Sequence, residues 1–234
     1  MASKKDSYWI PLADLMTVLM VIFLFISISY MLEVKKKQDE QNKVFQEYKK
    51  TKLNLLSELQ AEFVSDFVPD KWNAKINSDL SIVFINEDVM FSYNKSVVRP
   101  QFKEILEQFF PRYLNILLKP QYADKIAEVR IEGHTDIQGD YIYNLQLSQD
   151  RTRNVMKILL NLPYYESLYG TDKAKLRYWL TANGLSFGRT LDEDGNRTLF
   201  SGKKPDDLKC RRVEFRIVTE SDKIVEEALN KIDK

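Results

Sequence analysis

The fold of this chain is decided by residues 127–160, which read AEVRIEGHTDIQGDYIYNLQLSQDRTRNVMKILL. Apolar and polar side chains alternate from Ala127 to Glu132, which is the pattern of a half-buried strand. Apolar residues then recur at helical spacing from Tyr141 to Leu160. We therefore expect a strand, a short polar loop and a long helix in direct succession.

The segments on both sides extend this pattern into an α+β domain, which we place at residues 70–220. The expected architecture is a strand-helix-strand-helix-strand order with a mixed sheet. The predicted elements are strands at residues 80–85, 127–132 and 212–218, helices from Pro100 and over residues 141–160 and 173–180, and a C-terminal helix at residues 221–234.

The N-terminal part of the chain is predicted to be a membrane anchor. Residues 9–32 contain one charged residue, Asp14, and are otherwise dominated by Leu, Ile, Val, Phe and Met. As a helix this run is about 36 Å long, which spans a hydrocarbon core of about 30 Å. A cleaved secretory signal is the alternative, but the run is too long for one and offers no small-residue cleavage site. We expect an uncleaved transmembrane helix.

The composition excludes several kinds of site. The 35 basic and 34 acidic residues leave a net charge of +1, without the basic excess of a nucleic-acid-binding surface. One cysteine, Cys210, and one histidine, His134, cannot form an internal disulfide or a Cys- or His-rich metal site. Residues 191–196 lack the later glutamate of a calcium loop and are predicted to form a hairpin tip. His134 is expected to make a local hydrogen bond at the strand end.

Asp14 is the anchor residue for which we predict a function. A carboxylate inside a membrane helix costs about 2.5–3.5 kcal/mol on insertion scales and usually faces a protein partner or water. A position in the headgroup zone is the alternative. Residues 9–17, WIPLADLMT, resemble the B subunits of flagellar-type stators through the Ala-Asp-x-Met-Thr pattern, with Leu12 in place of the usual tyrosine. The resemblance implies that Asp14 carries the translocated ion.

A second resemblance rests on motifs in the C-terminal part of the chain. They are Gly133-His134-Thr135-Asp136-x-x-Gly139, Tyr143-Asn144-x-x-Leu147-Ser148-x-x-Arg151, Met90-Phe91-Ser92, Val98-Arg99-Pro100 and Cys210-Arg211-Arg212-Val213-Glu214-Phe215. In this order they resemble the OmpA-like peptidoglycan-binding domain over about residues 75–220. Cys210 and Thr152 stand where the family usually has asparagine and alanine. Arg211 and Arg212 are expected to support the sheet and the site loop.

Asp136 and Arg151 are the predicted centre of a ligand site. The stem peptide of peptidoglycan offers a zwitterionic diamino acid, for which a site needs one anion and one cation. Arg151 can bind a carboxylate bidentately and Asp136 can accept from the ammonium group; the resemblance assigns these roles to the same positions. Asn144 is expected to fix the loop or contact the ligand, with Tyr143 and Leu147 as walls. The alternative is a structural salt bridge between Asp136 and Arg151.

The two resemblances together imply a B subunit of an ion-driven inner-membrane motor, which is not an enzyme. Such subunits bind peptidoglycan in the periplasm, so residues 1–8 are expected in the cytoplasm, residues 9–32 in the membrane and residues 33–69 in a helical periplasmic linker. The implied partners are peptidoglycan, a polytopic A subunit and a second B copy, with five A to two B, and nucleic acid is not bound directly. No cofactor is expected. The translocated ion is expected to be a proton, with sodium as the alternative.

The branch within the stator family is predicted from the connection between anchor and domain. The short segment before Trp9 and the compact linker at residues 33–69 look more like the B subunits of Zorya anti-phage defence systems. Flagellar B subunits, the alternative within the family, usually have a longer connection with a plug. A purely structural wall anchor without ion flow is the alternative from another class, and the match around Asp14 argues against it.

Overall fold

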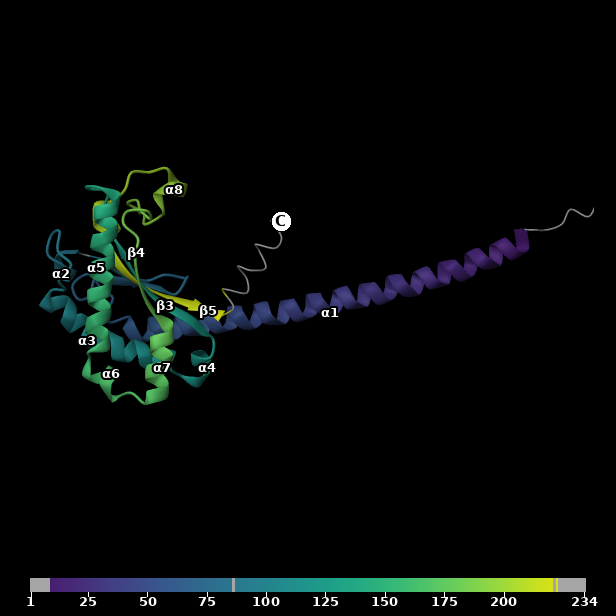
Figure 1. Ribbon diagram of the computed structural model, residues 1–234, viewed down its shortest axis with the longest axis horizontal. Coiled ribbons are helices and arrows are strands. Elements are labelled where there is room, and N and C mark those ends of the chain that lie inside the picture. Colours follow the sequence, from purple (N-terminus) through teal and green to yellow (C-terminus); the bar gives the residue numbers. More distant parts are fainter. Residues whose placement is uncertain (1–8, 86, 221, 223–234) are drawn as a thin grey trace, which may run out of the picture. The chain divides into compact units, whose positions relative to one another are not determined.

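The computed structural model describes residues 9–85, 87–220 and 222, which fall into two compact units with their boundary between Lys49 and Lys50 (Figure 1). Helix α1 (Trp9–Phe63) makes up the described part of the first unit and supplies the first residues of the second. The predicted cytoplasmic segment 1–8 lies outside the described residues. So does the predicted helix 221–234, apart from Asp222.

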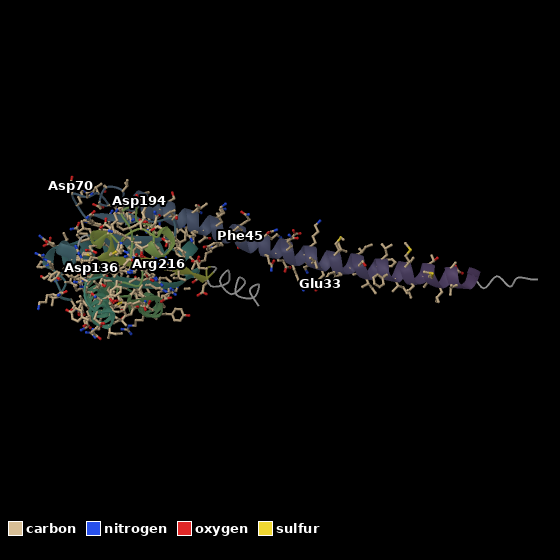
Figure 2. All side chains as sticks on the ribbon, turned by 90° about the horizontal axis from the view of Figure 1, so that it is seen from above. Glu33, Phe45, Asp70, Asp136, Asp194 and Arg216 are labelled. Atoms are coloured by element: carbon tan, nitrogen blue, oxygen red, sulfur yellow. The ribbon has the colours of Figure 1, made fainter. Side chains whose placement is uncertain are left out.

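Within the first unit, α1 has an apolar surface. Its Leu, Ile, Val, Phe and Met side chains from Leu12 to Leu32 are exposed (Figure 2). The hydroxyl of Thr17 donates to the carbonyl of Ala13 and that of Ser27 to the carbonyl of Phe23, both at 2.8 Å. These polar groups are therefore satisfied inside the helix, as a hydrocarbon environment requires. In the described part of the chain, α1 is the one helix long and apolar enough to cross a membrane.

The second unit is built on a five-stranded mixed sheet in the order β1-β2-β5-β3-β4. Strands β3 and β4 pair in parallel, and the other neighbours are antiparallel. The strands are β1 (Ala74–Ile76), β2 (Ser81–Ile85), β3 (Ile126–His134), β4 (Leu180–Gly184) and β5 (Arg212–Thr219). The predicted fold class is confirmed, and the three predicted strands are β2, β3 and β5; the sequence does not predict β1 and β4.

Three long helices pack against one face of this sheet (Figure 1). Buried side chains of these helices share one core with Val129 and Ile131 of β3, which alternate with the charged residues on the other face of that strand. The long helices are α3 (Pro100–Leu117), α5 (Tyr141–Leu160) and α7 (Gly170–Trp179), and the short ones are α2 (Glu87–Met90), α4 (Pro120–Ala123), α6 (Pro163–Ser167), α8 (Thr198–Ser201) and α9 (Asp207–Cys210).

Two local predictions are confirmed in this unit. Helix α5 has the predicted bounds, and it begins after Asp140, whose carboxylate accepts from the backbone N–H groups of residues 142 and 143. Residues 191–196 form a turn closed by an antiparallel bridge between Leu191 and Arg197, with Gly195 at a φ of 82°. This is the predicted hairpin tip.

The last part of α1 belongs to the domain core. Leu55, Leu59 and Phe63 are at most 1% exposed, and the Phe63 ring lies 5.2 Å from that of Phe109. The compact unit therefore begins at Lys50, whereas the sequence places the domain start at residue 70. The domain begins earlier than expected because Leu55, Leu59 and Phe63 form an apolar stripe on α1, and this stripe is buried against the domain core.

Polar contacts reinforce the same packing. The guanidinium of Arg112 on α3 donates to Glu62 at 2.6 Å and to Asp66 at 2.8 Å, and it lies 4.8 Å from the centroid of the Phe63 ring. Glu58 accepts from Lys119 at 2.6 Å, and this contact holds the pKa of the Glu58 carboxyl below its usual value. Residues 50–63 are thus tied to the domain by both apolar and charged side chains.

Leu59→Ala is expected to lower the free energy of unfolding of the domain by about 2–5 kcal/mol, because truncation of a fully buried leucine leaves a cavity. The control is Leu53→Ala on the same helix, where the side chain is 54% exposed and the expected loss is below about 0.5 kcal/mol. Denaturant titration of the full chain in detergent, followed by near-UV circular dichroism, compares the two. Equal losses would contradict the assignment of residues 50–63 to the core.

Candidate ligand-binding site

The site begins where β3 ends. The backbone N–H of Thr135 donates to the carbonyl of Ser186 at 3.0 Å, and that of Leu185 donates to Gly133 at 2.9 Å, so the loop after β4 holds the end of β3. A Cβ at Gly133 would lie 2.8 Å from the carbonyl oxygen of Ser148 on α5. Glycine at this position therefore lets α5 lie directly against the strand end and brings the helix to the loop.

Asp136 lies in the loop after this strand and is 8% exposed. One carboxylate oxygen accepts from the backbone N–H of Gln138 at 3.0 Å. The other accepts from the guanidinium of Arg211 at 2.8 Å. Asp136 thus takes its counter-charge from Arg211, which differs from the salt bridge with Arg151 that the sequence offered as an alternative.

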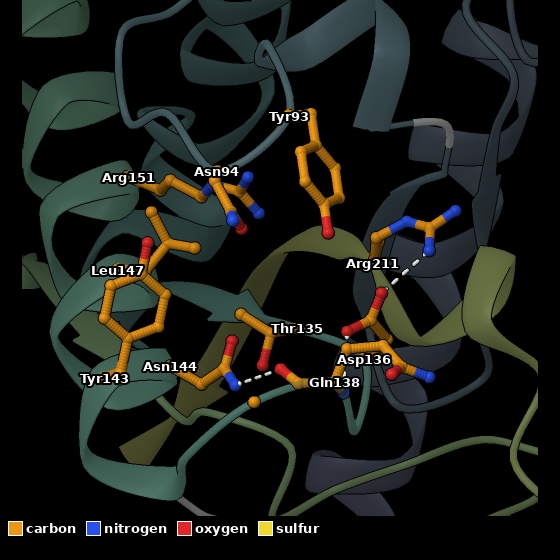
Figure 3. Close-up of a pocket in the computed structure, with 11 residues that line it drawn as sticks. Tyr93, Asn94, Thr135, Asp136, Gln138, Tyr143, Asn144, Leu147, Arg151 and Arg211 are labelled. Carbon is orange, nitrogen blue, oxygen red and sulfur yellow. Dashed lines mark hydrogen bonds and ion pairs between the residues drawn. The ribbon is translucent and has the colours of Figure 1, made fainter.

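Asn144 on the first turn of α5 holds the same loop. Its side-chain amide donates to the carbonyl of Gln138 at 2.7 Å and to that of Asp140 at 3.1 Å. Of the two roles expected for Asn144, fixing the loop is the one that these bonds provide. Tyr143 is half exposed and Leu147 is half buried, both on the side of α5 that faces the loop (Figure 3).

Arg151 lies two turns further along α5 and is 3% exposed. Its Nε donates to the carbonyl of Lys95 at 3.0 Å, and its guanidinium stacks 4.8 Å from the centroid of the Phe91 ring. The side chain is therefore held in one orientation by a hydrogen bond and by a cation–π contact. A fixed guanidinium fork is suited to binding a carboxylate through two parallel hydrogen bonds.

These side chains surround one cavity of about 140 Å³ (Figure 3). All five residues predicted for the ligand site line it, and Figure 3 shows Arg151 and Asp136 on opposite sides. The other lining residues are Tyr93, Asn94, Thr135, Gln138, Gly139 and Arg211. The cavity thus offers one anion flanked by two cations, which is the charge arrangement that a zwitterion with more carboxylates than ammonium groups requires.

The sequence analysis assigned none of these six other residues to the site, although Thr135, Gly139 and Arg211 belong to motifs quoted above and Gln138 lies between two motif residues. Arg211 is part of a motif quoted above, but it was expected only to support the sheet and the loop. Tyr93 and Asn94 come from a turn between α2 and α3, and Asn94 has a φ of 53°. A polar turn gives no sequence signal for a place in a cavity that is formed by distant elements.

The prediction for His134 is wrong. The imidazole is 3% exposed, and neither ring nitrogen has a hydrogen-bond partner among the described residues. Its Nε2 lies 3.8 Å from a carboxylate oxygen of Glu132 and 3.6 Å from one of Glu214. Burial, followed by the charges of Arg212 and other arginines, holds the pKa of His134 well below its usual value. The strand end directs the ring into a charged cluster, where no local backbone group can pair with it.

Glu132, His134 and Glu214 also lie close enough together to hold a metal ion. Each carboxylate is already paired with an arginine, however: Arg189 donates to one oxygen of Glu132 at 3.0 Å and Arg212 to one oxygen of Glu214 at 2.6 Å. A cation would have to displace these arginines, so the arrangement fits an ion-pair network better than a metal site. The expectation of no cofactor stays a prediction.

Comparison with known families gives a match at the site itself. The sequence profile of the OmpA family matches residues 90–166, a span that contains Asp136 and Arg151. Outer membrane protein A of Shimwellia blattae is 34% identical over 77 residues, which cover 33% of this chain and 30% of that protein. The solved structure of a MotB-like protein from Desulfovibrio vulgaris is 17% identical, covers 73% of this chain and 96% of that one, and has a TM-score of 0.47.

Two relatives match along nearly the whole chain. The Zorya protein ZorB of Escherichia coli strain Crooks is 35% identical over 241 residues, covering 96% of each protein. The Zorya protein ZorB of Escherichia coli O139:H28 is 26% identical over 222 residues, covering 90% of this chain and 87% of that protein. The similarity therefore includes the apolar helix and the domain together.

Proposed function

We infer the function of this chain from the premise that it belongs to the family of the Zorya protein ZorB, with which it is 35% identical over 96% of both lengths. The chain is a peptidoglycan-associated, stator-like B subunit. Beyond this we propose that it works in an ion-driven rotary motor of the bacterial inner membrane, in anti-phage defence. The observation that carries the proposal is the full-length similarity, because it covers both the helix that contains Asp14 and the C-terminal domain.

The wall end of the proposed function rests on the cavity at β3 and α5. We propose that the diamino acid of a peptidoglycan stem peptide binds there, with its ammonium group on Asp136 and a carboxylate on Arg151. Arg211 is already paired with Asp136 at 2.8 Å. It can share the Asp136 carboxylate with the ligand's ammonium group, or it can turn to a second carboxylate of the ligand. Binding and positioning account for this site without any covalent chemistry.

The membrane end rests on Asp14 in α1. We propose that residues 9–32 cross the inner membrane once, with residues 1–8 in the cytoplasm and the domain in the periplasm. An ion that binds Asp14 neutralises it, so the side chain can lie in a low-dielectric interface with a partner helix; release of the ion restores the charge. One elementary charge moving through 100 mV supplies about 2.3 kcal/mol for this cycle. A proton is the proposed ion, with sodium as the alternative.

The proposed partner is a polytopic A subunit, of which five surround two copies of this chain. In this arrangement the two wall-bound copies stay fixed while ion passage turns the A ring around them. An acid at one level of a single-pass helix needs such a ring, because one helix alone provides neither a path for the ion nor a second wall around the carboxylate. The proposal of this partner and this stoichiometry is supported by the resemblance to stator B subunits.

Complementation in cells that carry the native neighbouring genes tests this function. Deletion of the gene for this chain is expected to abolish protection against phage in a plaque assay, and its return is expected to restore it, with swimming unchanged. Loss of swimming with unchanged plaquing would replace the defence motor by a flagellar stator. Unchanged plaquing and swimming would contradict both motor functions.

A further inference from the structure

The face of the sheet opposite the long helices carries an arrangement of charges that the proposed function does not use. In the register of β3 and β5, Glu132 lies directly opposite Glu214, and Arg130 lies opposite Arg216. Glu132 and Glu214 are 2% and 5% exposed. Like charges that face each other across strands destabilise a sheet, so this face must be neutralised by neighbouring side chains.

Three arginines provide the neutralisation. Arg212 donates to one oxygen of Glu214 at 2.6 Å, and Arg216 donates to the other at 3.0 Å. Arg189 donates to Glu132 at 3.0 Å from the loop after β4. Arg216 also donates to Asp79 at 2.5 Å. Three carboxylates and three guanidinium groups are thus combined in one network.

Two further cations border a cavity of about 290 Å³ above this network. Lys75 on β1 and Arg197 after the hairpin tip line it together with Arg189, Arg212 and Arg216. Among the described residues, neither Lys75 nor Arg197 has a side-chain hydrogen bond or ion pair. The ammonium group of Lys75 reaches to within 3.4 Å of where a Cβ would stand on Gly195. The cavity wall therefore carries an excess of two positive charges.

The cations of this cavity also affect the pKa of the buried His134 imidazole, which lies 3.6 Å from Glu214. The pKa of His134 is lowered first by burial and then by the charges of Arg212, Arg189, Arg216 and Arg197, in that order. Carboxylate oxygens of Glu214 and Glu132 lie 3.6 and 3.8 Å from the Nε2 of the ring. The cations that line the cavity thus also act on the buried His134 ring.

This cavity is separate from the ligand site at Asp136. The two share no lining residue. Their separation follows from strand geometry, because successive side chains at the start of β5 point to opposite sides. Arg211 reaches Asp136 in the first cavity, and Arg212 reaches Glu214 in the second.

We propose that the cavity between β1, β5 and the hairpin tip at residues 191–196 binds a doubly charged anion of the phosphate class. Two unpaired cations match the charge of a phosphate group, and the guanidinium of Arg197 can bind two of its oxygens at once. Asn77 and Ser78 also line the cavity with polar groups, and the two lining carboxylates, Asp79 and Glu214, are paired with Arg216 and Arg212. This site does not depend on the proposed function, since it is argued from side chains that the proposed function does not use.

The test uses the full chain in detergent and inorganic phosphate as the probe, with chloride at matched ionic strength as the reference. Calorimetric titration is expected to detect phosphate binding to the wild type and at least about a tenfold rise of the dissociation constant in Lys75→Ala and in Arg197→Ala, since each removes a charge-assisted hydrogen bond. Lys157→Ala, an equal loss of charge on the exposed side of α5, is expected to bind phosphate as the wild type does.

A variant at Arg197 can be tested without loss of the fold. Arg197 is exposed and makes no side-chain contact of these kinds in the described structure, so Arg197→Glu is expected to fold as the wild type does and to abolish phosphate binding. Equal phosphate affinity in the wild type, Arg197→Ala and Arg197→Glu would overturn the proposal, as would equal binding of chloride.

The source of the phosphate group is distinguished by two further probes. Glycerol phosphate stands for a soluble phosphomonoester, and a short-chain phosphatidic acid, which is also a phosphomonoester, stands for a lipid headgroup. A lower dissociation constant for the lipid, lost in Arg197→Glu, would assign the site to membrane lipid. A lower constant for the soluble ester, lost in the same variant, would assign it to a soluble or wall-borne phosphate. Failure of both to bind, with inorganic phosphate still bound by the wild type, would assign the site to free phosphate.

Discussion

Cells that carry Asp14→Asn in place of the native residue are expected to be as sensitive to phage as cells without the chain. Asparagine has the size of aspartate and lacks its negative charge, so it can neither bind a proton nor return to a charged state. We expect a complete loss of phage protection, because no ion can be bound and released at this position without the acid. Plaquing on cells with the native neighbouring genes measures it, after membrane insertion and quantity of the variant have been checked.

The matched control is Asp39→Asn. Asp39 lies on the same helix, beyond the apolar run, and its side chain is exposed, so the same chemical change there is expected to leave protection intact. Asp14→Glu keeps the acid and is expected to retain part of the activity. Full protection with an inserted Asp14→Asn protein would contradict the ion-carrying role and leave a wall anchor without ion flow.

The strand, loop and helix at residues 126–160 were predictable because their signals are local. Helix α5 has apolar residues at helical spacing and begins after Asp140, whose carboxylate caps the first turn. The strands β1 and β4 were not predictable by the same means. Residues 74–76 are too short to show alternation, and residues 180–184, LTANG, are polar and end in glycine. Their pairing with β2 and β3 is decided by the sheet into which they fit.

The domain boundary shows a different limit. The apolar stripe of Leu55, Leu59 and Phe63 is visible in the sequence, where it fits either pairing between two copies or packing on the domain. The contact between Phe63 and Phe109, at 5.2 Å between ring centroids, belongs to the second solution. An apolar stripe on a helix predicts that this side of the helix is buried. It does not predict what the stripe packs against, because those residues come from distant parts of the chain.

The same distinction applies to the site. Asp136, Tyr143, Asn144, Leu147 and Arg151 were named together through the resemblance to the OmpA-like domain, and they line one cavity because they lie within one strand-loop-helix unit. The place of Arg211 beside Asp136 depends on the antiparallel pairing of β3 with β5. The environment of His134 depends on the same pairing, which brings Glu214 to the ring. Residues from one contiguous unit could be assigned from the sequence, and residues brought in by sheet pairing could not.

Arg151→Lys is expected to weaken binding of the full chain to purified peptidoglycan sacculi by about 10- to 100-fold. Lysine keeps the positive charge and most of the volume, but it loses the fork that binds a carboxylate through two hydrogen bonds, for which a loss of about 1.5–3 kcal/mol is typical. Asp136→Asn is expected to weaken binding to a similar degree, because the amide cannot neutralise an ammonium group. Co-sedimentation of the detergent-solubilised chain with sacculi measures both.

Arg153→Ala is the control for Arg151, because Arg153 lies on the same helix with its side chain 58% exposed and paired to Asp150 at 2.7 Å. It is expected to sediment with sacculi as the wild type does, and free diaminopimelate is expected to compete with wild-type binding. If Arg151→Lys and Asp136→Asn sedimented undiminished, the wall would be bound elsewhere on the domain. If only Arg151→Lys retained binding, a positive charge at this position would be enough to bind the ligand carboxylate, and the two parallel hydrogen bonds of arginine would not be required. Weakening in both variants but not in Arg153→Ala is the result that a zwitterion held between Asp136 and Arg151 requires.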